Sequence, residues 1–242
     1  MALSEHIVSS YEEELTNLHK AISEMGGMVE QAITDSTTAL LRLDHSGAKD
    51  VREADRRIDE MQHRINEMTI SIIARRQPMA TDLRMVVTAI QVANDLERTG
   101  DMAKQLAKRT VQIENLSLAP KFYNGMKHMA DLVARQLKAA LDAYSGRDPD
   151  AAIEVCNRDD EVDDMHTSLF RELLTYMMED PRNISPCTHL LFCAKNIERI
   201  GDHATNIAET IYHMVTGEQL PLERPKDDKS HRVVMHERVA AK

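Results

Sequence analysis

Apolar residues recur at every third or fourth position along most of this chain, which is the period of an amphipathic α-helix. Near the N-terminus, for example, Leu15, Leu18, Ile22 and Met25 follow this spacing. Short polar segments containing Gly, Pro, Asp or Asn separate stretches of this kind. The pattern therefore predicts six long helices, at residues 4–43, 48–75, 80–113, 121–144, 150–179 and 186–215.

Several expected helix ends carry residues that prefer such positions. Residues 44–47 are rich in residues that tolerate turn geometry. Pro78 ends the second helix, because the residue before a proline is biased away from the helical backbone. Asp148 is expected to cap the fifth helix ahead of Pro149, and Gly217 to end the sixth.

Residues 93–107 and 194–208 are two copies of one segment, related by an offset of 101. Both contain the pattern Glu-Arg-x-Gly-Asp, and seven of their fifteen positions are identical, which indicates an internal duplication. We therefore predict an all-α fold in which two three-helix bundles follow each other. The bundles are expected at residues 1–116 and 117–217, and a flexible C-terminal tail at 218–242.

The composition supports helices and narrows the function. Aromatic residues make up 3% of the chain, with no Trp, and Gly and Pro are scarce at 8 and 7. A net charge of −10 argues against a nucleic-acid binder. Neither a signal peptide nor a membrane-spanning run is recognisable. The three cysteines have no C-x-x-C spacing, so we expect a reduced, cytosolic chain.

Pairs of carboxylates four residues apart occur in both copies and on the helix before each copy. Residues four apart lie on the same side of a helix, so antiparallel neighbours would bring four carboxylates together in each bundle. The pairs are Asp55/Asp59 with Glu97/Asp101, and Asp159/Asp163 with Glu198/Asp202.

Two details of these pairs bear on their geometry. Asp160 and Asp164 form a shifted copy of the motif on the fifth helix, which leaves its register open. Gly100 and Gly201 each lie between two carboxylates, where the missing side chain would let the neighbouring helix approach.

Four clustered carboxylates repel one another unless cations or arginines neutralise them. Oxygen ligands suit hard cations, so we expect divalent or ferric ions (Mg, Mn, Fe or Zn) in two carboxylate clusters, with no organic cofactor. The alternative is that Arg98 and Arg199 pair with the acids themselves. If they face outward instead, these two arginines are candidates for binding a partner.

The chain has no recognisable catalytic motif. It contains no Gly-rich phosphate loop, no G-x-S-x-G and no convincing nucleophile with a base. Ferritin-like di-iron proteins need two Glu-x-x-His motifs, and only Glu60 and His63 fit one here. We therefore expect no enzyme. The alternative is a carboxylate-rich helical metal-binding protein or metalloenzyme.

Four segments together resemble the PhoU family. They are IIARRQPMATDLRMV (72–86), LERTGDMA (96–103), LTYMMEDPR (174–182) and LLFCAKNIERIGDHATNIAE (190–209). The resemblance covers about residues 5–217. It implies a cytoplasmic, all-helical, homodimeric protein that binds no DNA, and the family's E(D)-x-x-x-D motif matches all four acidic pairs.

The resemblance also implies a role in phosphate homeostasis. PhoU-like proteins are negative regulators of the phosphate-starvation response and of phosphate uptake. They are expected to act as adaptors between PstB, the ATPase of the phosphate ABC transporter, and the sensor histidine kinase PhoR. These partners would recruit the protein to the inner face of the membrane without inserting it.

Overall fold

The computed structural model describes residues 2–113 and 120–220. The first bundle consists of α1 (Ala2–Arg42), α2 (His45–Arg76) and α3 (Ala80–Thr110). The second consists of α4 (Pro120–Gly146), α5 (Pro149–Asn157), α6 (Asp159–Glu179), the short 3₁₀-helix η1 (Pro181–Asn183) and α7 (Ile184–Thr216). No strand occurs in this part of the chain, so the predicted all-α fold of two three-helix bundles is confirmed. The predicted bundle boundary at 116/117 and most of the predicted tail lie outside the described residues.

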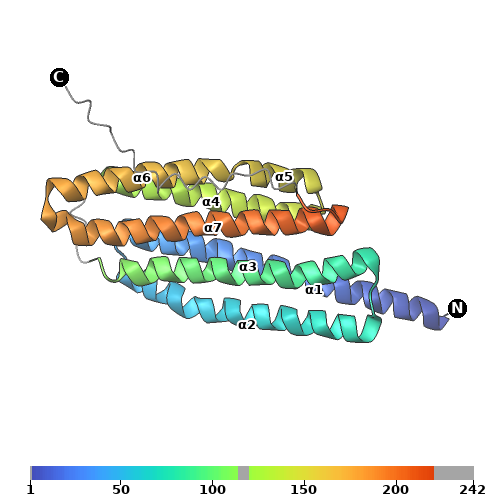
Figure 1. Cartoon of the computed structure of the whole chain (residues 1–242). Coiled ribbons are helices and arrows are strands. Elements are labelled where there is room, and N and C mark those ends of the chain that lie inside the picture. The colour runs from blue at the N-terminus through green and yellow to red at the C-terminus, as the bar shows by residue number, and fades with distance from the viewer. Residues whose placement is uncertain (1, 114–119, 221–242) are drawn as a thin grey trace, which may run out of the picture.

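The two bundles lie against each other along their length (Figure 1). α3 and α7, the helices that carry the duplicated segment, pack side by side and run in opposite directions. α1 also packs on α4, so two pairs of helices hold the bundles together. The two copies of the duplicated segment therefore lie on neighbouring helices of the contact between the bundles.

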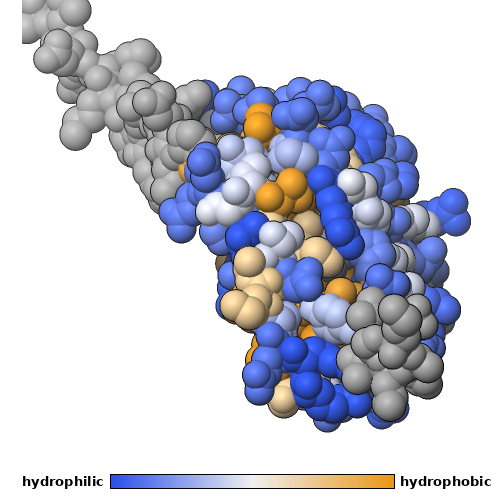
Figure 2. Space-filling view, turned by 90° about the vertical axis from the view of Figure 1, so that its right-hand side faces the viewer, coloured by the Kyte–Doolittle hydropathy of each residue, from blue (hydrophilic) through white to orange (hydrophobic). Residues whose placement is uncertain are grey.

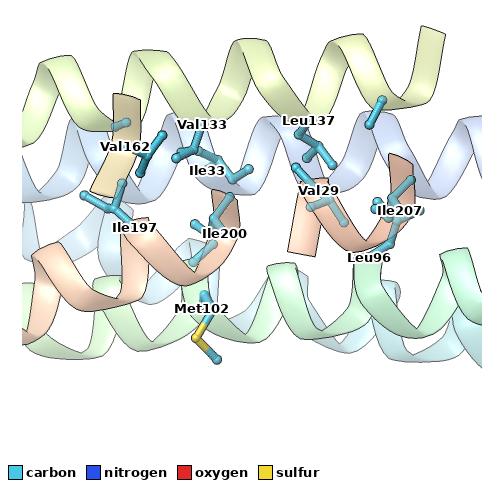
Figure 3. Close-up of a cluster of buried hydrophobic side chains, with 14 of the residues drawn as sticks. Val29, Ile33, Leu96, Met102, Val133, Leu137, Val162, Ile197, Ile200 and Ile207 are labelled. Carbon is cyan, nitrogen blue, oxygen red and sulfur yellow. The ribbon is translucent and has the colours of Figure 1, made fainter. Parts of the chain in front are cut away.

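Apolar side chains from both bundles form one continuous core. Figure 3 shows Val29 of α1, Leu96 of α3, Val133 of α4 and Ile200 of α7 within it, and all four are fully buried. Burying each such side chain contributes about 1.5–3 kcal/mol. Separating the bundles would expose this surface, so we expect the two repeats to unfold together.

The second helix begins earlier than predicted, at His45, inside the segment 44–47 that we expected to be a turn. Asp44 Oδ1 accepts hydrogen bonds from the backbone N–H groups of Ser46 and Gly47, both at 3.0 Å. This is an N-cap, which satisfies N–H groups that have no partner within the helix. A Cβ at Gly47 would lie 2.8 Å from Asp44 Oδ2, so glycine leaves room for the cap.

Two other predicted helix ends are confirmed. Asp148 accepts hydrogen bonds from the N–H groups of Asp150 and Ala151 at 2.9 and 3.0 Å, with Pro149 in the first turn of α5. Gly217, with φ at 78°, ends α7 in the left-handed conformation that glycine adopts without strain.

The predicted fifth helix is interrupted, so the expectation of one continuous helix over residues 150–179 is wrong at Arg158. The backbone there has φ −93° and ψ 0°, and α6 starts anew at Asp159. The Arg158 N–H donates to the carbonyl of Val155, three residues back instead of four. The three acidic residues that follow are stabilised by the positive end of a new helix, which explains why the break falls before them.

Large apolar side chains are exposed near the α2–α3 turn and near the corresponding α6–α7 turn. Figure 2 looks onto the end that carries the α2–α3 turn, where apolar residues interrupt a largely hydrophilic surface. No helix in the described part is long and apolar enough to cross a membrane. The exposed residues are Ile70, Met79, Leu83, Val87, Leu174, Met178, Ile184 and Phe192.

Candidate functional site

The first acidic cluster joins Asp55 and Asp59 of α2 to Glu97 and Asp101 of α3. Burial raises the pKa of Glu97, and the negative charges of Asp101, Asp59 and Asp55 raise it further. Burial also raises the pKa of Asp59, with Asp55 as the next cause. The structure therefore brings these four carboxylates within electrostatic reach of one another.

A lysine that the sequence analysis did not single out neutralises part of this cluster. Lys104 Nζ lies 2.5 Å from Asp55 Oδ2 and 3.3 Å from Asp101 Oδ1, so it connects α2 to α3. The hydrogen bond to Asp55 raises the pKa of Lys104. The Asp55 side chain is only 5% exposed, and its lysine partner compensates much of the cost of burying that charge.

The glycines of the motif are points of close approach. A Cβ on Gly100 would lie 3.0 Å from Cδ1 of Ile58, so α2 packs directly over it. A Cβ on Gly201 would lie 3.2 Å from Oε1 of Gln136 and 3.6 Å from Cγ1 of Val162. In the second bundle, therefore, both α4 and α6 approach the motif.

The second acidic cluster joins Asp159 and Asp163 of α6 to Glu198 and Asp202 of α7. Burial raises the pKa of Asp163 to about 6, and the charges of Asp159, Glu198 and Asp202 add to the rise. Asp159 and Asp163 are partly buried, whereas the shifted pair, residues 160 and 164, is exposed. Helix α6 thus presents the Asp159/Asp163 register to α7.

Neutral groups take a larger part in the second cluster than in the first. The Thr205 hydroxyl donates to Asp159 Oδ1 at 2.9 Å, and Gln136 Nε2 donates to the same oxygen at 3.4 Å. Lys195 Nζ pairs with Glu198 Oε1 at 2.6 Å from the exposed rim. By the offset of 101, Thr205 occupies the position of Lys104, so the duplication does not preserve the central lysine.

Two buried oxygens of the second cluster have no hydrogen-bond partner. They are Glu198 Oε2 and Gln136 Oε1, and the residues that carry them are 9% and 5% exposed. An unsatisfied buried polar group costs about 1–3 kcal/mol. Among the described residues, the buried atoms without a partner include none from the first cluster. The second cluster therefore has an unmet demand for positive charge or a donor.

The carboxylates of the two clusters are the right chemical type to bind a hard cation, but they are not arranged as a metal site. All eight are carboxylates, the ligands that such ions prefer. As the side chains stand, no three His, Cys, Asp or Glu residues of the described ranges converge closely enough to hold an ion. Binding in the second cluster would require its carboxylates to move together and Lys195 to release Glu198.

Arg98 and Arg199 are exposed, and the close ion pairs of the two clusters are made by Lys104 and Lys195 instead. Arg98 lowers the pKa of Glu97 only as the smallest of several influences. The alternative in which these arginines neutralise the clusters is therefore not supported. Both side chains are accessible to solvent.

A further contact links the two copies of the motif. His203 Nδ1 lies 2.9 Å from Asp95 Oδ1 across the α3–α7 interface, and both side chains are largely buried. His203 follows Asp202, and Asp95 precedes Glu97 by two residues. Because this contact spans 108 positions of sequence, no local pattern could have predicted it.

The remaining candidate residues occupy ordinary positions. His63 contacts the neighbouring Gln62, and Glu60 pairs with Arg56 on an exposed helix face. All three cysteines are buried and free, and burial raises the pKa of Cys193 to about 12, which makes its thiol unreactive.

A family model and individual related proteins all match this chain to the same family. The PhoU domain family matches residues 22–110 and 126–211. The chain is 55% identical to the phosphate-specific transport system accessory protein PhoU homolog of Rhizobium meliloti, over 92% of this chain and 94% of that protein. It is 47% identical to the homolog of Caulobacter vibrioides, over 93% and 98%.

Solved structures show the same fold. The crystal structure of PhoU from Pseudomonas aeruginosa is similar with a TM-score of 0.82 and 39% identity, covering 86% of this chain and all of that one. The phosphate transport system regulatory protein PhoU from Streptococcus pneumoniae has a TM-score of 0.81 and 26% identity, covering 88% and 100%.

Proposed function

The chain belongs to the PhoU family, and from this membership we propose that it is an accessory protein of a phosphate-specific transport system. It represses the phosphate-starvation response and restrains phosphate uptake. It does so as an adaptor between the transporter ATPase PstB and the histidine kinase PhoR. It works in the cytoplasm as a homodimer and reaches the membrane through these partners.

The observation that carries this proposal is the match of both duplicated halves to one family whose related proteins are named for an accessory role. The described clusters consist of carboxylates with two lysines, one amide and one threonine hydroxyl, all groups that can pair with a partner's charges. An adaptor can bias a kinase only if it binds the two states of that kinase with different affinity. Arg98 and Arg199, exposed beside the clusters, are the side chains that would make such contacts.

We further propose that the second cluster binds a divalent or ferric ion more readily than the first. Asp159, Asp163, Glu198 and Asp202 would hold the ion, which would add positive charge to the single charge that Lys195 supplies at the rim. Glu198 Oε2 is buried there without a partner. In the first cluster Lys104 already supplies a positive charge between two of the acids, so an ion there must compete with it.

The regulatory proposal is tested in the host bacterium. A reporter of a phosphate-starvation promoter is measured in ample phosphate, in strains with and without the gene for this chain. Deletion should leave the reporter on, and a plasmid copy should restore repression. Deleting the PhoR kinase in the same strain should switch the reporter off again. Normal repression in the single deletion strain would refute the proposal.

The metal proposal has a separate test that needs no activity. The purified chain is analysed by elemental mass spectrometry beside two variants, each with one cluster converted to amides. Changing Asp159, Asp163, Glu198 and Asp202 to Asn or Gln should remove most of the metal. The corresponding changes in the first cluster should remove less. Equal metal content in all three proteins would contradict the assignment.

A further inference from the structure

A groove runs along the first bundle between α1 and α2, its lining includes no residue of α3, and its volume is about 710 Å³. Its floor is apolar and includes Met28, Val51 and Ile58. Small residues such as Gly27 and Ala54 line it as well, and a Cβ on Gly27 would meet nothing within 4 Å. The groove therefore has an apolar floor, and the small side chains beside it would let another chain approach the backbone closely.

The second bundle has a groove at the equivalent place, with a volume of about 310 Å³. Each of its ten lining residues is the counterpart of a lining residue of the first groove, at an offset of 104. Met28, for example, corresponds to Leu132, and Val51 to Val155. Because both repeats form it, the groove belongs to the architecture of the repeat and is not an accident of one side chain.

The two grooves differ in charge. The first is lined by four acids, Glu24, Asp35, Asp44 and Asp50, and one base, Arg57. The second is lined by two arginines and two glutamates, so its charges balance. The first groove thus combines an apolar floor with an acidic rim, whereas its duplicate is smaller in volume and its lining charges balance.

We propose that the α1–α2 groove binds an amphipathic helix of a partner protein, one with basic residues on both sides of its apolar face. Helix-in-groove binding uses an apolar stripe against such a floor. The lining of α1 spans residues 24–39, which corresponds to about 22 Å or four helical turns. The unbalanced carboxylates select a cationic helix and speed its association.

This inference does not rest on the proposed function, since the groove includes none of the eight carboxylates of the two acidic clusters. Its neutral counterpart also predicts a preference within the molecule. A cationic helix should occupy the first bundle and leave the second free, although both share the same architecture.

The test uses a fluorescently labelled synthetic helix of about 18 residues, the length of five turns, with Leu and Ala on one face and Lys on the other. Its binding to the full chain is followed by fluorescence anisotropy at moderate salt. The double variant Asp35→Ala/Ala54→Arg gives the first groove the residues of the second at two positions. Both sites are exposed on helices, and both new residues favour helix, so the fold should be retained.

A control with the same change in net charge separates the groove from the overall charge. Asp131→Ala/Asp142→Ala removes two exposed acids from α4, outside either groove. The groove variant should weaken peptide binding at least tenfold and the control less than twofold. Equal weakening by both variants would show that only net charge matters, and would overturn the proposal.

A steric variant tests the groove without changing charge. Gly27→Leu places a side chain in open space above the floor and should also weaken binding of the peptide by tenfold or more. Peptide binding that matches the unmodified chain would overturn the proposal. The proposal would also be overturned if Gly27→Leu changed the oligomeric state in sedimentation velocity while peptide binding stayed intact. The groove would then be a contact between copies of this chain.

Discussion

Replacing Lys104 by methionine should destabilise the protein and create a demand for cations in the first cluster. Methionine keeps the length of the side chain but removes the charge that lies between Asp55 and Asp101. Asp55, with 5% of its side chain exposed, would then face three other carboxylates without a partner.

The magnitude follows from the burial of the two partners. Removing one partner of a buried ion pair costs about 3–5 kcal/mol, because the remaining charge stays buried and unpaired. Lys104 is 35% exposed, and water screens exposed pairs, so the cost should be lower. We expect a loss of about 2 kcal/mol in the free energy of unfolding, which is a large part of the usual total.

The assay is urea denaturation of the chelator-treated protein, followed by circular dichroism, with and without millimolar Mn²⁺. Lys127→Met is the matched control, because Lys127 pairs with Asp131 at 2.6 Å on an exposed helix face. That change should cost no more than about 0.5 kcal/mol. Mn²⁺ should restore stability to Lys104→Met more than to the control. A variant as stable as the parent, or one that Mn²⁺ does not stabilise, would refute the reasoning.

Two further predictions concern single positions. Gly27→Ala should stabilise the protein by roughly 0.5–1 kcal/mol in thermal unfolding, because the new Cβ meets open space. Gly26→Ala should lose this gain, because its Cβ would lie 2.7 Å from Leu141 Cδ1. A larger gain at Gly26 than at Gly27 would contradict this packing. Burial against Tyr144, and then the charge of Arg147, lower the pKa of His19 below its usual 6.5. As pH falls, the unfolded chain therefore binds a proton at His19 before the folded chain does, so stability should fall as pH drops through 6.5. In His19→Phe, the denaturation midpoint should depend less on pH between pH 7 and 5.

Much of the fold was predictable because it depends on local periodicity. The apolar spacing that includes Leu18, Ile22 and Met25 gave the first helix, and those three side chains are buried in the core. The duplicated motif identified the acids of α3 and α7, and the matching pairs on the preceding helices identified those of α2 and α6. These features are repeated along the chain, so sequence alone reveals them.

The features that the sequence did not reveal are those in which the two repeats differ. Lys104 and Thr205 occupy equivalent positions, but Lys104 supplies a positive charge to its cluster, whereas Thr205 supplies only a neutral hydroxyl donor. Gln136 reaches the second cluster from α4, a helix on which no motif was recognised. The break at Arg158 depends on a local turn and on the acids after it, not on the apolar pattern, which continues through it.

The difference between the two clusters is the central structural claim, and a cation titration tests it most directly. Mn²⁺ binding to the chelator-treated chain is measured by isothermal titration calorimetry, together with Glu198→Gln and its duplicate Glu97→Gln. We predict that the tightest site is lost in Glu198→Gln and retained in Glu97→Gln, because of these two glutamates it is Glu198 that has a buried oxygen without a partner. Loss of that site in Glu97→Gln alone, or its survival in Glu198→Gln, would contradict the account.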